Sequence, residues 1–280
     1  MSTAQTLVLG AIAGFTIFLG LPIGRLPALG ASARAGLSAL ATGILIFLLW
    51  DVLAGAVEPI EEAAEEHEWG ELLGYGSLGI AGFVLGLMGL VYYAEWMRRK
   101  SSRRATPLVG PGAAAVDEFE GRSFIERLTP GKQLALMIAV GIGVHNFGEG
   151  LAIGQAAASG AASLAVTLII GFGLHNATEG FGICGPMNGE GTRPSWRFLA
   201  MLGVIGGGPT FLGTLIGQAW TSTEISIIFF AVAAGSILYV VQELFAVNRR
   251  YGNATLVMWL VVAGIVLGFA TDFVIDAAGI

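Results

Sequence analysis

Two stretches of the chain pair a histidine with a glutamate in the same frame. Residues 141–150 read GIGVHNFGEG, and residues 171–180 read GFGLHNATEG. Residues four apart share one face of a helix, so each histidine would project beside its glutamate, with an asparagine next to it. Imidazoles and carboxylates, with amide oxygens nearby, suit Zn²⁺, Fe²⁺, Mn²⁺ or a similar ion. The pattern therefore predicts a metal site, and its central side chains are His145, Glu149, His175 and Glu179.

The surroundings of both stretches are apolar. Of 280 residues, 55% are hydrophobic and 12% are charged, and the mean hydropathy is +0.76. Soluble domains carry about 25% charged residues, so the composition indicates a polytopic membrane protein. An ionisable group near the bilayer centre costs at least ~2.5–3.5 kcal/mol. No lysine or arginine lies at that depth in the sequence, so a divalent cation is the simplest partner for the four groups.

Stretches of about 20 apolar residues predict membrane helices, and the chain has eight of them. The expected fold is an all-α bundle of eight transmembrane helices that forms a single transmembrane domain over residues 1–280. The predicted spans are 5–24, 35–57, 73–96, 132–158, 161–187, 196–220, 224–246 and 254–277. Both motif histidines then lie near the middle of consecutive spans that run in opposite directions, like an inverted repeat. Glu149 is displaced outward from the centre and Glu179 inward.

The basic residues give the orientation. All 14 fall in the connections after the first, third, fifth and seventh spans, and the other connections and both tails carry none. Cytoplasmic loops are enriched in Lys and Arg. We therefore expect both termini outside and a flexible cytoplasmic linker over about 97–131. No basic surface remains for binding nucleic acid.

These residues carry a family resemblance. HNFGEG and HNATEG resemble the paired HNxxEG motifs of the ZIP family of divalent-metal transporters. ATGILIFLLWDVL (41–53) is similar to the second helix of that family, and GSILYVVQEL (235–244) is similar to its seventh. The resemblance implies eight membrane helices, both termini outside and a variable cytoplasmic loop between helices 3 and 4. This topology matches the one derived above from the charges.

The resemblance also implies a function and a ligand set. The protein would be a transporter, not an enzyme, that moves Zn²⁺, or else Fe²⁺, Mn²⁺ or Cd²⁺, into the cytoplasm across the cell membrane. It would need no resident cofactor, and a homodimer is left open. Helices 2, 4, 5 and 7 would line the pathway. The implied ligands are His145, Asn146, Glu149, His175, Asn176 and Glu179.

The chain departs from the family pattern at four positions. Gly148 and Thr178 stand where the family usually has a proline before each glutamate. Gly208 replaces a glutamate that many members carry before a proline in the sixth helix. Leu45 occupies the second-helix position where some members have methionine. These changes favour one metal, or a weakened second site.

Several polar residues outside the motifs are candidates for the pathway. Asp51 is either an entrance ligand or an interfacial acid, and Glu243, with Gln242 beside it, is either part of the exit or an ion-pair partner of the inner loops. The acidic stretch 58–71 is either a solvated helix end or a surface that gathers cations.

Two other functions compete with transport. A membrane-embedded metal hydrolase of the HExxH type would place two histidines four apart, and no HExxH occurs in the chain. A metal sensor would need a signalling domain, and the longest soluble stretch has only about 35 residues and no histidine.

Overall fold

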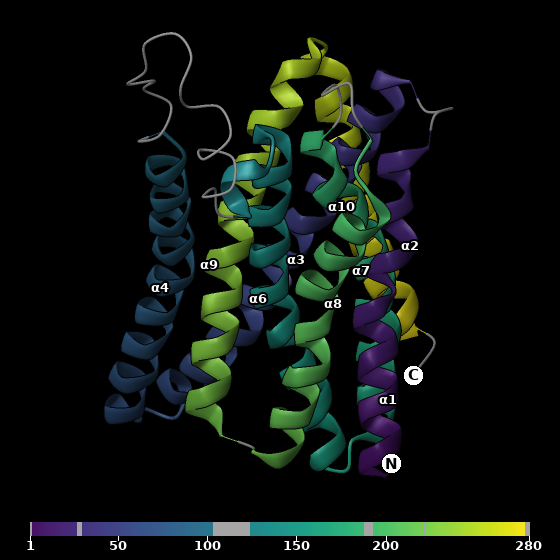
Figure 1. Ribbon diagram of the computed structural model, residues 1–280. Coiled ribbons are helices and arrows are strands. Elements are labelled where there is room, and N and C mark those ends of the chain that lie inside the picture. The colour runs from purple at the N-terminus through teal and green to yellow at the C-terminus, as the bar shows by residue number, and fades with distance from the viewer. Residues whose placement is uncertain (1, 27–29, 103–123, 188–192, 221, 278–280) are drawn as a thin grey trace, which may run out of the picture.

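The computed structural model describes residues 2–26, 30–102, 124–187, 193–220 and 222–277. Within these ranges the chain is a bundle of long helices without strands, which confirms the all-α fold class (Figure 1). The α-helices are α1 (Thr3–Phe15), α2 (Ile17–Gly20), α3 (Ala31–Glu65), α4 (Trp69–Ser102), α6 (Pro130–Ala158), α7 (Ala162–Cys184), α8 (Trp196–Ala219), α9 (Thr223–Asn248) and α10 (Ala254–Ala277). Short 3₁₀ turns connect them: η1 (Leu21–Arg25), η2 (Ile125–Arg127), η3 (Gly185–Met187) and η4 (Arg249–Tyr251).

Local sequence fixes where the central helix starts and stops. The Thr129 hydroxyl accepts a hydrogen bond from the Lys132 amide, and Pro130 occupies the first helical position, where no amide donor is needed. At the other end Gly160 has a φ of 83°, a left-handed conformation that glycine adopts without strain. α6 runs unbroken between these signals, through Gly148.

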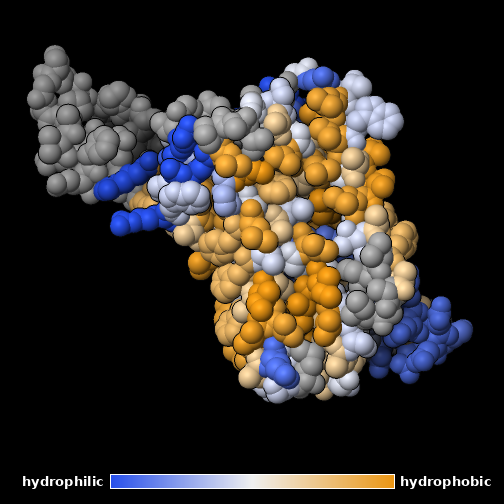
Figure 2. Space-filling view, turned by 90° about the vertical axis from the view of Figure 1, so that its right-hand side faces the viewer, coloured by the Kyte–Doolittle hydropathy of each residue, from blue (hydrophilic) through white to orange (hydrophobic). Residues whose placement is uncertain are grey.

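Seven helices of the described residues are long and apolar enough to cross a membrane. α7 is not among them although it has 23 residues, because the second motif places polar and charged side chains along its middle. Figure 2 shows a largely apolar middle on the face that it presents, with hydrophilic surface toward the two ends. The chain is therefore a multi-pass membrane protein.

α6 occupies the centre of the bundle. Its span is 78% buried, against 22% for α4 and 17% for α10, and it packs on α7, α8 and α9. The approach to α8 is closest, because a Cβ at Gly150 would collide with the Thr210 carbonyl and a Cβ at Gly213 would collide with the Phe147 carbonyl. Small residues let membrane helices pack backbone to backbone in this way.

Two helices extend further than the sequence predicts. α3 continues through Pro59 to Glu65, and α4 begins at Trp69 and reaches Ser102. The predicted linker 97–131 was therefore too long at both ends, since 97–102 is helical and α6 starts at Pro130. Residues 103–123 lie outside the described ranges.

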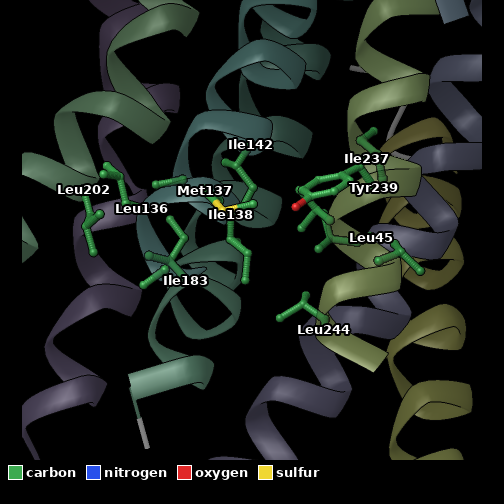
Figure 3. Close-up of a cluster of buried hydrophobic side chains, with 14 of the residues drawn as sticks. Leu45, Leu136, Met137, Ile138, Ile142, Ile183, Leu202, Ile237, Tyr239 and Leu244 are labelled. Atoms are coloured by element: carbon green, nitrogen blue, oxygen red, sulfur yellow. The ribbon is translucent and has the colours of Figure 1, made fainter. Parts of the chain in front are cut away.

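A layer of buried, mostly apolar side chains fills the bundle on one side of the motifs. Figure 3 shows this apolar layer, whose members come from α3, α6, α7, α8 and α9: Leu45, Leu136, Met137, Ile138, Ile142, Ile183, Leu202, Ile237, Tyr239 and Leu244. On α6 the layer spans Leu136 to Ile142, roughly 9 Å of helix at 1.5 Å per residue. It lies between the motifs and the end of the bundle that carries η1, η2 and η4.

Candidate metal site

The first motif places a histidine and a glutamate side by side in the centre of α6. His145 and Glu149 are buried, and His145 Nε2 lies 3.1 Å from Glu149 Oε1. The same nitrogen lies 3.5 Å from Glu179 Oε1 on α7. One imidazole nitrogen thus faces carboxylates from both motifs.

Asn146 connects the two motif helices to α8. Its Nδ2 donates a hydrogen bond to Glu179 Oε2 at 3.3 Å and another to the Gly206 carbonyl at 2.9 Å. Both amide hydrogens are used in this way, so the orientation of the side chain is fixed. The Asn146 Oδ1 atom has no hydrogen-bond partner among the described residues.

The second motif repeats the arrangement on α7 with different neighbours. Asn176 Nδ2 donates to the Ala13 carbonyl of α1 at 3.1 Å, as Asn146 does to α8. His175 is 7% exposed, and its ring packs edge-on against Phe47 of α3, with 5.7 Å between centroids. Neither ring nitrogen of His175 has a hydrogen-bond partner among the described residues.

Most polar atoms of the motifs lack hydrogen-bond partners in the described part of the chain. These atoms are Nδ1 and Nε2 of both histidines, both carboxylate oxygens of Glu149, Oε1 of Glu179 and Oδ1 of both asparagines. The contacts of His145 Nε2 are close but are not aligned as hydrogen bonds. Buried polar atoms without partners are costly, and native proteins keep few of them.

The side chains are not arranged as a complete metal cage. Over the described ranges, no group of three or more His, Cys, Asp or Glu side chains has the geometry to hold an ion. The imidazole of His145 instead contacts the glutamates directly. The arrangement therefore supplies buried unsatisfied ligand atoms that a cation would satisfy.

A cavity of about 650 Å³ reaches the motifs from the end of the bundle opposite the apolar layer. Its walls come from α3, α6, α7 and α9, and four carboxylates line it: Asp51, Glu58, Glu61 and Glu149. Glu58 and Glu61 are exposed at the outer end of α3, whereas Glu149 is buried. The acids thus extend from the surface down to the first motif, and Asp51 is one of them.

The two other predicted pathway residues do not join this group. Gln242 is exposed and lines a separate cavity between α9 and α10, in which none of the motif residues takes part. Glu243 is half-buried beside Tyr239. The structure therefore does not bring Gln242 or Glu243 to the motifs.

The departures from the family pattern also have structural counterparts. A Cβ at Gly208 would find only Val204 Cγ1, at 3.9 Å, within contact range, so this face of α8 is open. Leu45 is buried in the apolar layer. Neither position supplies a ligand atom.

The comparison with protein families decides the class of the molecule. A protein-family model described as "ZIP Zinc transporter" matches residues 115–276. The match covers more than half of the chain and includes both motifs. The chain belongs to the ZIP family. No curated protein matches the chain. ZIP proteins are transporters of divalent metals and not enzymes, so membership gives the class of function.

Sequence reasoning missed some contributions to the ZIP site. The carbonyls of Ala13 and Gly206, which hold the two asparagines, belong to helices without a motif, and no sequence signal marks them. Glu58 and Glu61 were recognised only as part of an acidic stretch. Their spacing of three residues, which puts both on one helix face, was the available signal.

Proposed function

We propose that this ZIP protein carries Zn²⁺ across the cell membrane by way of the two HN-x-x-E motifs. The observation that supports this most strongly is the set of buried, unpartnered nitrogen and oxygen atoms on α6 and α7 beside an acid-lined cavity. The proposed ligands are His145, Glu149, His175 and Glu179, with the amide oxygens of Asn146 and Asn176. Fe²⁺, Mn²⁺ and Cd²⁺ are the related substrates that these ligand types also accept.

The spacing around His145 supports a site that a small adjustment completes. In a tetrahedral zinc site, with bonds near 2.1 Å, neighbouring ligand atoms are roughly 3.4 Å apart. His145 Nε2 lies 3.1 Å from Glu149 and 3.5 Å from Glu179. Rotation of the His145, Glu149 and Glu179 side chains could therefore bring their ligand atoms around an entering ion. α6 and α7 would need to move little. With Gly208 and Leu45 in place of further ligands, we propose a single central ion.

The proposed direction of transport is into the cytoplasm. The end that carries the basic connections is assigned to the cytoplasm because such loops are enriched in Lys and Arg. α7 is proposed as the eighth span, which places both termini outside. The acid-lined cavity then opens outward and the apolar layer closes the inner side. Release inward requires that layer to separate, as in alternating access around a central site.

Zinc uptake into proteoliposomes of the purified protein tests the proposal. We expect saturable uptake that Glu149→Gln and His175→Ala each reduce at least about tenfold, since loss of even an outer-shell partner of a metal ligand typically costs about 10–100-fold. Glu95→Gln is the matched control, because this glutamate pairs with Arg99 on the exposed face of α4. Uptake that survives both motif substitutions would refute the ligand assignment. Tight zinc binding without uptake would favour a sensor, and turnover of a substrate would favour a hydrolase.

The assembly and the membrane of residence are separate proposals. We propose the cell membrane as the location and leave a homodimer as the candidate assembly. Light scattering of the purified protein in detergent measures its oligomeric state directly.

A further inference from the structure

A second cavity lies at the basic end of the bundle, away from the metal-binding motifs. Its volume is about 660 Å³, and it lies between the last turns of α9, the η4 turn and the first turns of α10. Apolar side chains make most of its wall: Leu238, Val241, Phe245, Val257 and Met258. α10 is the least buried of the candidate membrane helices, so this cavity is at the outside of the bundle, where lipid surrounds the protein.

Three polar side chains interrupt the apolar wall, Gln242 within it and Asn248 and Arg249 at the end of α9. Arg249 is exposed, and its Nε donates a hydrogen bond to the Phe245 carbonyl at 3.4 Å, which holds the side chain along the last turn of α9. Arg250 adds a second positive charge in the same turn. The cavity thus has a cationic end and an apolar body.

Asn248 provides an independent sign of a missing partner. The residue is 1% exposed, and its Nδ2 donates to Thr42 Oγ1 on α3 at 3.0 Å. Its Oδ1 accepts no hydrogen bond from the described residues. Asn248 lines the cavity, and a buried amide oxygen without a donor is costly. A molecule that fills the cavity beside Asn248 should therefore carry a hydroxyl or similar group.

These features exclude a metal ion and fit an amphiphile. A cation would meet the positive charge of Arg249 and a wall without carboxylates. A phospholipid offers acyl chains for the apolar wall, a phosphate for the guanidinium and, in a glycerol headgroup, hydroxyls for Asn248 and Gln242. Basic residues at the cytoplasmic membrane surface attract anionic lipids in this way.

We propose that the cavity between α9 and α10 binds one anionic phospholipid with a hydroxyl-bearing headgroup, of the phosphatidylglycerol type. The phosphate lies at Arg249, a headgroup hydroxyl donates to Asn248 Oδ1, and an acyl chain follows the apolar wall. This site is independent of the proposed transport site.

Native mass spectrometry of the detergent-purified full chain, titrated with phosphatidylglycerol or phosphatidylcholine, tests the proposal. We expect one saturable phosphatidylglycerol adduct, weakened about fivefold by Arg249→Gln, as the loss of one basic contact to an anionic lipid predicts. Ala254→Trp, which fills the cavity from the start of α10, should weaken it similarly. Arg197→Gln is the charge-matched control, because Arg197 is exposed at the start of α8 and does not line the cavity.

Three results would overturn the proposal. The first is equal binding of phosphatidylglycerol and phosphatidylcholine, or no binding of either. The second is an equal effect of Arg197→Gln and Arg249→Gln, which would indicate only a general charge effect. The third is competition by soluble glycerol phosphate as effective as that by the lipid, which would remove the role of the apolar wall. If a variant melts abnormally, a photoactivatable phosphatidylglycerol still decides the question, because its cross-links must map to residues 238–258.

Discussion

Asn146 Nδ2 lies 3.3 Å from Glu179 Oε2 and thereby ties the first motif helix to the carboxylate of the second. The same nitrogen donates to Gly206 on α8, so the position of Glu179 depends on a helix that carries no motif. The proposed site is therefore held by contacts from outside the two motifs.

Replacing Asn146 by alanine should weaken zinc transport, because it misplaces Glu179 and removes a proposed ligand oxygen. The change removes the hydrogen bond to the Glu179 carboxylate, and a bond to a charged group is worth about 1.5–3 kcal/mol. We expect a KM for zinc uptake raised about tenfold, since each 1.4 kcal/mol of binding is one factor of ten. Asn253→Ala is the control, because Asn253 only caps the start of α10. Equal KM values for the two variants would argue against any role for Asn146 at the zinc site.

Zinc should stabilise the folded protein, and chelation should reverse the effect. An ion at 100 times its Kd adds about 2.7 kcal/mol to the free energy of unfolding. Glu179→Gln should abolish this stabilisation without lowering the melting temperature of the zinc-free protein. The reason is that a neutral amide is cheaper to bury than a carboxylate without a cation. Thermal melts with and without zinc measure both effects, and a zinc-dependent shift retained in Glu179→Gln would contradict the proposed ligand.

Removing the charges at the mouth of the acid-lined cavity should slow zinc capture at low concentration. Glu58 and Glu61 line that cavity, and carboxylates that line a cleft raise the local concentration of cations. We expect the double variant Glu58→Gln/Glu61→Gln to raise KM about threefold at low salt, with little change in maximal rate, and the effect should shrink as salt screens the charges. Glu65→Gln/Glu66→Gln carries the same charge change at the same end of α3 but outside the cavity. Equal effects from the two pairs would show that the cavity mouth has no special role.

The contact between α6 and α8 should not tolerate a side chain at Gly150. A methyl group there would collide with the Thr210 carbonyl, and backbone atoms cannot rotate away. We expect Gly150→Ala to lower the free energy of unfolding by about 1–3 kcal/mol, the usual cost of overpacking. Gly208→Ala is the matched control on α8, because a Cβ there meets only Val204 Cγ1 at 3.9 Å. Denaturation in detergent measures the free energy of unfolding of both variants. An unchanged value for Gly150→Ala would show that α6 and α8 can move apart at no cost.

Most helices and both motifs could be predicted from the amino-acid sequence alone. Within a bilayer each helix must satisfy its own backbone hydrogen bonds, so long apolar stretches and their polar boundaries predict the helices directly. Helical periodicity likewise predicted His145 and Glu149 on one face of a helix. In the structure His145 Nε2 lies 3.1 Å from Glu149 Oε1. Hydropathy was less informative for α7, because the polar motif residues lower it.

Only the tertiary structure decided which polar residues belong together. Asp51, Glu58 and Glu61 line one cavity with Glu149, whereas Gln242, within the family-like stretch 235–244 of α9, lines another. The anchors of the two asparagines are backbone carbonyls of Ala13 and Gly206, which any residue type supplies. A sequence records side-chain identity along one helix, but such contacts depend on the rotation and depth at which neighbouring helices pack. That packing is set by many small contacts, such as those of Gly150 with α8, and not by any motif.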